Sequence, residues 1–305
     1  MKKKVSCHII TYNQESFIAQ CIDGVLNQQT NFPIEIIIGD DNSTDGTRKI
    51  VSDYARRHPD IIKLNLREVR GSGIPGKENF MTTFEMCDGE YISLCDGDDY
   101  WTDPLKLQKQ VDFLEANPDY VLTFHKADIL TPEGNFMEDF ITVVPNGYED
   151  IETLAQFGNY IHTPTVVFRN VIKELPLEFH DSPIGDYFLY MILAEHGKIK
   201  YFDNVMAVYR YGVGILSKMT SLDAVNTNVI LYSCMISYLK NGDVKKILFQ
   251  RQRDIIAAYD RQLRKELAQE PLSNRVAIKY ILSSFREPSK IFSRINQRVF
   301  KFLKR

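Results

Sequence analysis

The sequence lacks any long apolar run. No stretch of about 18 consecutive apolar residues occurs, so we expect no segment that spans a membrane. The apolar run after the N-terminal lysines stops at residue 11 and is too short for a signal peptide. Cysteine is also scarce: the five cysteines are an odd, scattered set without a CxxC pair, which is typical of reduced thiols. These absences predict a cytoplasmic protein.

A strong net charge is missing as well. The net charge of −3 gives no general attraction to nucleic acid, and the alternation of aromatic and basic residues that favours single-strand binding is absent. The average hides a basic C-terminal end, because residues 271–305 contain nine Lys/Arg and one Asp/Glu. The sequence therefore predicts no nucleic-acid partner, but a positively charged end of the chain.

The composition, with 44% apolar and 25% charged residues, is that of a soluble globular protein, and 305 residues allow one large domain or two smaller ones. Short apolar runs alternate with segments of helical periodicity, which predicts an α/β fold with a mostly parallel sheet and flanking helices. Asn13 or Ser16 is expected to cap the first helix, and Ser43 or Thr44 the second. The expected strands are residues 5–10, 34–39, 61–66, 91–95, 121–124, 141–144, 165–168, 199–202 and 205–209.

Three carboxylates surround one glycine directly after the expected strand at residues 91–95. Asp96, Asp98 and Asp99 repel one another, and this raises at least one pKa or demands a cation. Mg²⁺ or Mn²⁺ relieves such repulsion and usually sits between carboxylates and a substrate phosphate. Gly97 allows the backbone to approach a ligand closely. Because ligands bind beyond the carboxyl ends of strands in open α/β sheets, we expect a ligand site here; a solvated acidic turn is the alternative.

The expected strand at residues 34–39 also ends in acidic residues, Asp40 and Asp41. Carboxylates at neighbouring strand ends can serve one ligand, and the ribose hydroxyls and base N–H groups of a nucleotide need such acceptors. The alternative role for Asp41 is the N-cap of the following helix. The pattern favours ligand binding for Asp41 and leaves the two roles evenly balanced for Asp40.

Three segments together resemble a known family: residues 7–13 (CHIITYN), 38–47 (IGDDNSTDGT) and 89–99 (GEYISLCDGDD). In this order and at these separations they resemble the family 2 glycosyltransferases, which have the GT-A fold. The resemblance covers roughly residues 5–215. It implies a Rossmann-like GT-A domain, which we place at residues 1–216, followed by a helical C-terminal appendage at residues 217–305.

The resemblance also implies roles for single residues. Asp41 matches the acid that faces the nucleobase. Asp96 and Asp98 match the DXD motif, in which Asp96 approaches the ribose beside Gly97 and Asp98 holds Mn²⁺ or Mg²⁺ on the diphosphate. The residues that match the loop lining the nucleotide pocket are Thr11, Tyr12, Asn13 and Glu15.

Asn79 matches a family asparagine that usually follows an arginine. Glu78 stands in the place of that arginine, so Lys77 becomes the substitute basic contact to the donor. Residues 71–78 also approach the P-loop pattern G-x-x-x-x-G-K-[ST]. However, Glu78 replaces the hydroxyl that binds the metal, and Pro75 removes an N–H donor, which together argue against an NTPase.

Asp186 begins the next strongly apolar helical segment. Sugar transfer with inversion needs a carboxylate that removes the acceptor proton on the face opposite the departing diphosphate. In the family an acid that starts a helix after the DXD motif has this role, and Asp186 matches it. A helix cap or a dipole contact is the alternative, and both readings are compatible. His180 and Asp181 are the nearby alternatives for the base.

Contacts to the acceptor and the phosphates are less specific. The family often has a glycine-rich loop with a histidine after the last strand; Tyr211 stands near that place here, with Arg210 or Ser217 as phosphate candidates. Residues 161–164 are expected to border the acceptor. His125, at a strand end, is expected to be a surface histidine.

From residue 217 onward the pattern becomes helical, with helices expected at residues 222–239 and 244–267. Within residues 288–305 an apolar stripe lies beside a basic one. A basic amphipathic helix suits an anionic membrane surface, at about 1 kcal/mol per basic residue. Packing against the catalytic domain is an equally weighted alternative.

The sequence as a whole predicts an inverting, metal-dependent transferase. It moves one sugar from a nucleotide diphosphate donor, most simply a UDP-sugar, to a saccharide or lipid-linked acceptor, in cell-surface polysaccharide synthesis. Its predicted place is the cytoplasm, with a peripheral contact at the inner face of the membrane if residues 288–305 bind lipid.

Three alternatives remain. One is a scaffold protein whose helical C-terminal region is the functional part. A sugar-phosphate nucleotidyltransferase needs a glycine-rich basic loop after the first strand, and residues 11–14 (TYNQ) form no such loop. A non-catalytic nucleotide-sugar-binding protein would tolerate the loss of Asp186.

Overall fold

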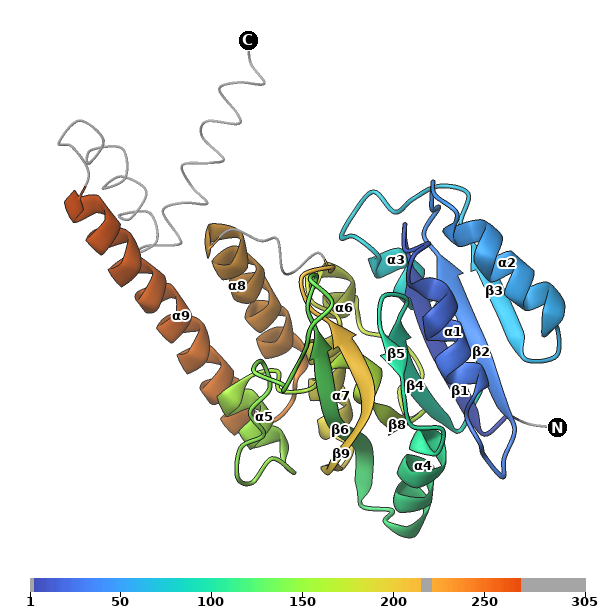
Figure 1. The fold of residues 1–305 in the computed structure, drawn as a ribbon. Coiled ribbons are helices and arrows are strands. Elements are labelled where there is room, and N and C mark those ends of the chain that lie inside the picture. Colours follow the sequence, from blue (N-terminus) through green and yellow to red (C-terminus); the bar gives the residue numbers. More distant parts are fainter. Residues whose placement is uncertain (1–2, 215–220, 270–305) are drawn as a thin grey trace.

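The computed structural model describes residues 3–214 and 221–269, in which strands and helices alternate to build one sheet covered on both faces (Figure 1). Residues 1–2, 215–220 and 270–305 lie outside this description. The phosphate candidate Ser217 and the proposed membrane-binding stripe at residues 288–305 therefore lie outside the described residues.

Four parallel strands form the first half of the sheet, in the order β3-β2-β1-β4. Their bounds are β1 Val5–Thr11, β2 Ile34–Asp40, β3 Ile62–Leu66 and β4 Tyr91–Asp96. Residues that alternate along β2 belong to different hydrophobic cores: Ile36 and Ile38 pack on one face and Ile37 on the other. Strands buried on both faces need such unbroken apolar runs, which is why the sequence pattern located them well.

The second half of the sheet is mixed. Its strands are β5 Tyr100–Trp101, β6 Tyr120–Leu130, β7 Phe136–Met137, β8 Val167–Arg169 and β9 Lys198–Arg210. β8 is antiparallel to β4 and β6, whereas β9 is parallel to β6 and antiparallel to β5. The sheet is thus parallel over its first four strands and mixed beyond them.

Several expected strand bounds differ from the structure. The strand expected at residues 121–124 is Tyr120–Leu130, and the one expected at 165–168 is Val167–Arg169. The predicted strands at residues 199–202 and 205–209 are one strand, β9, because register shifts near His125 and Lys126 of β6 absorb the irregularity between them. Residues 141–144 form no strand; the segment that pairs with β6 is β7, a few residues earlier.

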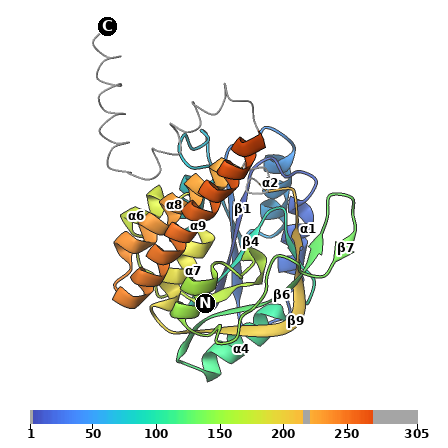
Figure 2. The ribbon, with the colours of Figure 1, turned by 90° about the vertical axis from the view of Figure 1, so that its left-hand side faces the viewer.

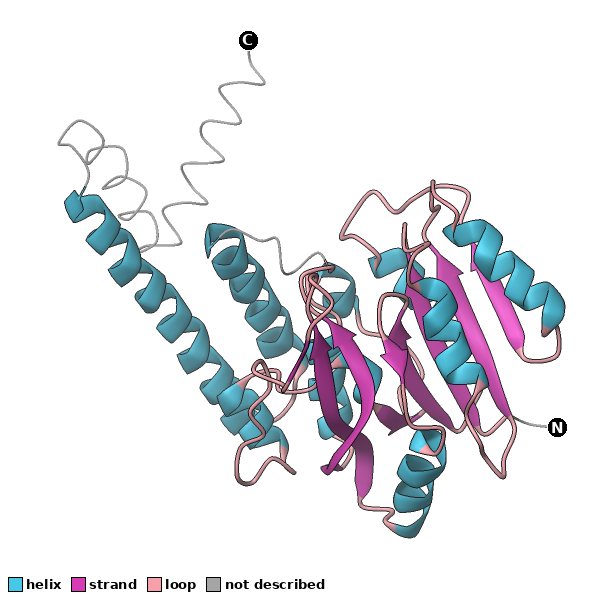
Figure 3. Cartoon of the chain, in the orientation of Figure 1, coloured by secondary structure: helices cyan, strands magenta, loops and turns pink. Residues whose placement is uncertain are grey.

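Helices cover both faces of the sheet, as Figures 2 and 3 show. One face carries α1 Ile18–Leu26, α2 Thr47–Arg57 and α4 Lys106–Ala116. The other face carries α3 Lys77–Glu85, α5 Ile151–Phe157, α6 Leu177–Asp181 and α7 Asp186–Ala194. A 3₁₀ turn, η1 Thr163–Thr165, leads into β8.

Two long helices follow, α8 Ser221–Tyr238 and α9 Gly242–Gln269. Tyr232 and Met235 of α8, and Val244 and Leu248 near the start of α9, are buried in the same core as α7. The helical character predicted for this region is confirmed, while its division from residues 1–216 as a separate domain stays a prediction. Over the described part of the chain, no helix has both the length and the apolar character that a membrane crossing requires.

The predicted helix caps are wrong. Phe17 precedes α1 and Gly46 precedes α2, and neither helix has a side-chain cap. Asn13 and Ser43 instead join the two loops: the Asn13 amide donates to Ser43 Oγ (2.9 Å), and Asn13 Oδ1 accepts from the Thr44 amide (2.8 Å). Their polar side chains thus hold two strand ends together.

Candidate active site

The carboxyl ends of three parallel strands meet at one edge of the sheet. In the register of the sheet, Thr11 of β1 pairs with Asp40 of β2, and Ile10 of β1 pairs with Asp96 of β4. The loops that follow stay attached to β1, because the Asp41 amide donates to the Thr11 carbonyl and the Gly97 amide to the Ile10 carbonyl, both at 3.0 Å. The two acidic loops predicted from the sequence therefore flank β1.

Gly97 lies where no side chain fits. A Cβ built on it would lie 2.5 Å from Gln14 Oε1 and 2.9 Å from Thr11 Oγ1. Thr11 and Gln14 are themselves joined by a 2.7 Å hydrogen bond. Glycine therefore lets the acidic loop lie directly against the end of β1, where Thr11 is buried.

The acidic residues after β4 differ in exposure. Asp98 and Asp99 are buried, while Asp96 is partly exposed. Burial raises the pKa of Asp96 to about 8, with further contributions from Asp98 and Asp186. Burial also raises the pKa of Asp98, against the opposing effect of Arg210. Crowded, desolvated carboxylates of this kind gain strongly from a cation.

This donor set fits the predicted Mn²⁺ or Mg²⁺. Arg210 is the cation that acts on Asp98, but its guanidinium donates to the main-chain oxygen of Asp98 and not to the carboxylate. Within residues 3–214 and 221–269, no three His, Cys, Asp or Glu side chains are grouped to hold a metal by themselves. A magnesium-type site built from one or two carboxylates plus substrate phosphates matches this arrangement.

Arg210, at the end of β9, holds the acidic loop in place. Its amide donates to Asp99 Oδ1 (2.8 Å), and its guanidinium also donates to Gln20 Oε1 (2.5 Å). The rings of Phe17 and Tyr100 lie 4.8 and 4.7 Å from the guanidinium carbon. With these partners, Arg210 is a structural anchor of the loop, which accounts for it without the phosphate contact considered from the sequence.

Replacing Arg210 with Met is expected to destabilise the protein by roughly 1.5–3 kcal/mol, because charged hydrogen bonds to a buried loop are lost. Urea denaturation measures this difference. The exposed Arg56, which pairs only with a neighbour on its own helix, provides the matched control: Arg56→Met should cost less than about 0.5 kcal/mol. Equal stabilities of the two variants would contradict the anchoring role.

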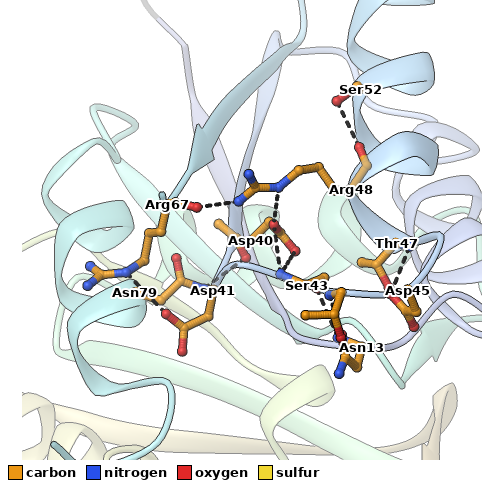
Figure 4. A network of polar contacts seen from close by, with 12 residues as sticks. Asn13, Asp40, Asp41, Ser43, Asp45, Thr47, Arg48, Ser52, Arg67 and Asn79 are labelled. Atoms are coloured by element: carbon orange, nitrogen blue, oxygen red, sulfur yellow. Dashed lines mark hydrogen bonds and ion pairs between the residues drawn. The ribbon is translucent and has the colours of Figure 1, made fainter. Parts of the chain in front are cut away.

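Asp41 lies on the other side of β1, between Arg67 and Arg70, and Figure 4 shows it beside Arg67. It is buried, and its Oδ1 lies 3.1 Å from Arg67 Nε and its Oδ2 3.9 Å from Arg70 Nε. The Arg70 guanidinium stacks on the Tyr12 ring at 3.7 Å. The sequence analysis missed both arginines; their place just after an apolar strand, β3, was the available signal.

Asp40 is a structural residue. It is fully buried, accepts a 2.8 Å hydrogen bond from Arg48 Nε, and also accepts from the Ser43 amide at 3.2 Å (Figure 4). Arg48 further donates to the main-chain oxygen of Arg67. These bonds connect β2, α2 and the end of β3.

The predicted pocket residues Asn13 and Glu15 are exposed and bind the loop after β2. Asn13 has a left-handed backbone (φ 51°), and Glu15 Oε2 accepts from the Gly46 amide at 2.6 Å. Thr11, Tyr12, Asn13 and Glu15 thus lie at the end of β1 and in the loop that follows, which is bonded to the loop after β2. Their role in donor binding stays a prediction.

Asn79 lies deeper than expected. It is buried, and its Nδ2 donates to the Gly39 carbonyl at 2.8 Å, so it supports β2 directly before Asp40. A Cβ on Gly39 would lie 2.4 Å from Asn79 Oδ1. Asn79 Oδ1 has no hydrogen-bond partner among the described residues.

Lys77 and Asp186 lie near each other at the start of α7. Lys77 is buried, and its Nζ lies 4.0 Å from the centre of the Phe179 ring. This Nζ has no hydrogen-bond partner in the described structure. A Cβ built on Gly185 would lie 3.3 Å from Lys77 Nζ. Burial lowers the pKa of Lys77 to about 8, partly opposed by Asp186. Lys77 therefore stands closer to the candidate base than the sequence suggested.

Asp186 is the first residue of α7, and Gly185 precedes it as the cap. Its Oδ1 accepts from the Tyr187 amide (2.7 Å) and its Oδ2 from Asn159 Nδ2 (3.0 Å). Burial raises the pKa of Asp186, opposed by these hydrogen bonds and by Lys77. The alternatives His180 and Asp181 are exposed on α6.

His125 is buried and not, as expected, on the surface. Its Nδ1 is hydrogen-bonded to the Lys126 carbonyl at 2.8 Å, so Nδ1 carries the proton. Burial lowers the pKa of His125 well below its usual value, and the ring is neutral. His125 lies in the middle of β6 and not at a strand end, because β9 pairs with β6 as far as Leu130, a long-range contact that the local sequence does not reveal.

A sequence profile of Glycosyl transferase family 2 matches residues 6–175, more than half of the chain. The chain belongs to this family. The match contains all three segments on which the resemblance was based, so the predicted family is confirmed.

Solved structures of glycosyltransferases share the fold. A mannosyltransferase of Pyrobaculum calidifontis, in complex with GDP-Man and Mn²⁺, gives a TM-score of 0.60 at 18% identity over 96% of this chain and 83% of that one. TarS of S. aureus, in complex with UDP-GlcNAc, gives 0.57 at 20% identity over 80% and 70%. Such identities show the fold alone, and the predicted GT-A fold is thereby confirmed.

Curated relatives match over different lengths. The uncharacterized protein Rv1520 of Mycobacterium tuberculosis is 37% identical over 201 residues, which are 66% of this family 2 chain and 57% of the relative. The glucosyltransferase WfaP of Escherichia coli is 26% identical over 262 residues, 82% of this chain and 98% of WfaP. The chain therefore spans little more than half the length of the first of these relatives.

Proposed function

We propose that this family 2 protein is an inverting glycosyltransferase that moves one sugar from a nucleotide diphosphate donor, with UDP as the carrier. The observation that carries the proposal is the cluster of desolvated carboxylates at the end of β4, where no cation among the described residues pairs with Asp96. This cluster lies between Asp41 on the nucleotide side and Asp186 on the opposite side. Asp41 is thus assigned to the nucleotide, the carboxylate cluster to the diphosphate and Asp186 to the acceptor.

On the nucleotide side, Asp41 accepts a hydrogen bond from an N–H group of the base. Arg67 and Arg70 hold the Asp41 carboxylate in place, and the stack of Arg70 on Tyr12 offers a flat surface beside it. TarS, a structural neighbour, was solved with UDP, which supports UDP as carrier; the mannosyltransferase neighbour carries GDP-Man. The choice of UDP is therefore a matter for experiment.

At the diphosphate, Asp98 would hold Mn²⁺ or Mg²⁺, and Asp96 would contact the ribose. When bound, the metal neutralises the charge that develops on the departing diphosphate. Asp99 and Arg210 keep the loop in the shape that presents Asp98. Gly97 keeps the same loop in contact with Thr11.

At the acceptor, Asp186 removes the proton of the attacking hydroxyl. The hydroxyl oxygen forms a bond to the anomeric carbon while the bond from that carbon to the diphosphate oxygen breaks, so the configuration inverts. Asn159 orients the Asp186 carboxylate, and Lys77 favours its ionised form. Desolvation makes Asp186 a stronger base than an exposed aspartate.

The acceptor is proposed to be a saccharide or a lipid-linked saccharide in cell-surface polysaccharide synthesis. WfaP, by its name, acts on a diphosphoundecaprenol-linked sugar, which supports the lipid-linked form. A cytoplasmic location is part of the proposal, because an odd, scattered set of five cysteines without a CxxC pair fits a reducing compartment. Residues 288–305 would then supply the peripheral contact with an anionic membrane.

A thermal-shift screen across UDP-, GDP-, CDP- and dTDP-sugars with Mn²⁺ tests the donor. We expect the largest rise in melting temperature with a UDP-sugar, and release of UDP when a suitable acceptor is added. A nucleotidyltransferase would instead form pyrophosphate from a sugar phosphate and a nucleoside triphosphate. No shift with any nucleotide sugar would contradict the proposed function.

A further inference from the structure

A hollow in the protein surface lies apart from the proposed site: none of the residues assigned to the donor, the metal or the base lines it. It is a cavity of about 430 Å³ between β6, β9 and residues 138–144. The lining residues that matter for its chemistry are Lys126, Glu138, Asp139, Thr142, Tyr201 and Asp203. A volume of this size accommodates one or two sugar rings, in the range of small-molecule sites.

The lining carries an excess of negative charge. Glu138, Asp139 and Asp203 face one cation, Lys126, which is already paired with Glu138 at 2.8 Å. His125, also in the lining, is neutral because burial lowers its pKa well below the usual value. Phosphates and carboxylates are therefore repelled, so this cavity does not suit the anionic donor.

The polar groups of the lining mainly accept hydrogen bonds. The Tyr201 hydroxyl donates to Asp203 Oδ1 at 3.1 Å, and burial and Asp203 raise the pKa of Tyr201 to about 12, so the phenol stays neutral. Val143 and Val144 add apolar surface beside the Tyr201 ring. A partner that donates many hydrogen bonds, has no negative charge and offers a C–H face matches this lining, and a neutral sugar has these properties.

The cavity is connected to the acidic cluster by two stacked rings. His162 Nε2 is hydrogen-bonded to Asp139 Oδ2 (2.9 Å) and Thr142 Oγ1 (3.0 Å) in the cavity wall. The His162 ring stacks on Tyr209 with centroids 4.7 Å apart. Tyr209 in turn lies within reach of the charge of Asp99, which together with burial raises the Tyr209 pKa. The His162 and Tyr209 rings thus lie on the side of the cavity that faces the acidic cluster.

The segment before His162 also leads to the candidate base, since Asn159 is the residue that donates to Asp186. We propose that the cavity binds a neutral saccharide unit of the acceptor. This inference rests on the proposed function for its role in the reaction. The binding of a neutral saccharide can be measured independently of that role.

Saturation-transfer NMR on the full chain tests the inference, with cellobiose, chitobiose and maltose as neutral probes and glucuronate as the anionic probe. At about 10 mM probe we expect signals from at least one neutral disaccharide and none from glucuronate. Val143→Trp, which adds a large ring to the cavity wall at an 80% exposed position, should weaken the neutral signal roughly tenfold. Leu177→Trp, at a 75% exposed position on α6, is the control and should leave it unchanged.

Loss of the signal in Val143→Trp but not in Leu177→Trp supports the site. An equal signal in the two variants, no signal from any neutral disaccharide, or a stronger signal from glucuronate overturns it. UDP binding to the same samples separates the two proposals. If UDP fails to bind while a neutral disaccharide still responds to Val143→Trp, the donor assignment fails and the saccharide site stands.

Discussion

Asp186→Asn is expected to lower the turnover number by about 10²–10⁴-fold while leaving donor affinity within about twofold of the wild type. The substitution keeps the size of the side chain and an oxygen that can accept from the Tyr187 amide. It removes the charge that takes the acceptor proton. Initial rates of UDP release with saturating donor, together with a donor affinity from calorimetry, measure the two effects separately.

Asp181→Asn is the matched control, because Asp181 is an exposed acid on α6 and the nearest sequence alternative for the base. It should retain full turnover. If Asp186→Asn transfers sugar at the wild-type rate, or if Asp181→Asn is the inactive variant, the assignment of the base is wrong.

The pH dependence of kcat/KM is a second test of Asp186 as the catalytic base. Burial raises its pKa, Lys77 opposes that shift, and the reaction needs the ionised carboxylate. Activity should therefore fall as the pH falls through this raised pKa, at a pH above the ordinary aspartate value of about 3.9. An acidic limb at the ordinary value would show that the base is a solvated carboxylate.

Asp98→Asn is expected to reduce the rate of sugar transfer by about 10²-fold or more. The reason is that a neutral amide replaces a charged metal ligand, which removes several kcal/mol of charge stabilisation from the transition state. Asp98 is buried in a loop held by Arg210 through main-chain contacts, so the fold should survive the change. Rates measured over a range of Mn²⁺ concentrations show whether the remaining activity still depends on the metal.

Asp119→Asn provides the control for this variant, since Asp119 is an exposed acid paired with Lys198 away from the site. It should keep both the rate and the Mn²⁺ dependence of the wild type. An Asp98→Asn enzyme with an unchanged Mn²⁺ dependence would place the metal on other residues.

The strand ends could be predicted because their signals are local. An apolar run buried on both faces identifies a strand without knowledge of its neighbours, and the polar residues that follow it lie at its carboxyl end. The motifs then placed Asp41 and Asp98 at the edge where the register of the sheet brings them, on either side of β1. The family match covers this same part of the chain.

Contacts between segments that are distant in the chain could not be predicted from the sequence. Arg210 reaches Asp98 across 112 residues, and nothing near Arg210 in the sequence indicates that its guanidinium belongs to the loop after β4. Arg67 and Arg70 became neighbours of Asp41 only through the pairing of β2 with β3. The buried position of His125 likewise depends on β9, which pairs with it from far along the chain.

Helix starts were mispredicted for a related reason. Asn13 and Ser43 have the residue types of N-caps, and capping is the commonest use of such residues beside a helix. In the folded chain each finds a partner on the other loop, which local sequence cannot show. Polar residues at the ends of neighbouring parallel strands therefore have two competing uses, and the sheet topology decides between them.

The central claim is that Asp98 binds the donor diphosphate through a divalent metal ion. Isothermal titration calorimetry of UDP with the full chain, in Mn²⁺ and again in excess EDTA, tests it most directly. The account predicts binding at least about tenfold tighter in Mn²⁺, a difference of about 1.4 kcal/mol or more. Equal affinity for UDP in Mn²⁺ and in EDTA would contradict it.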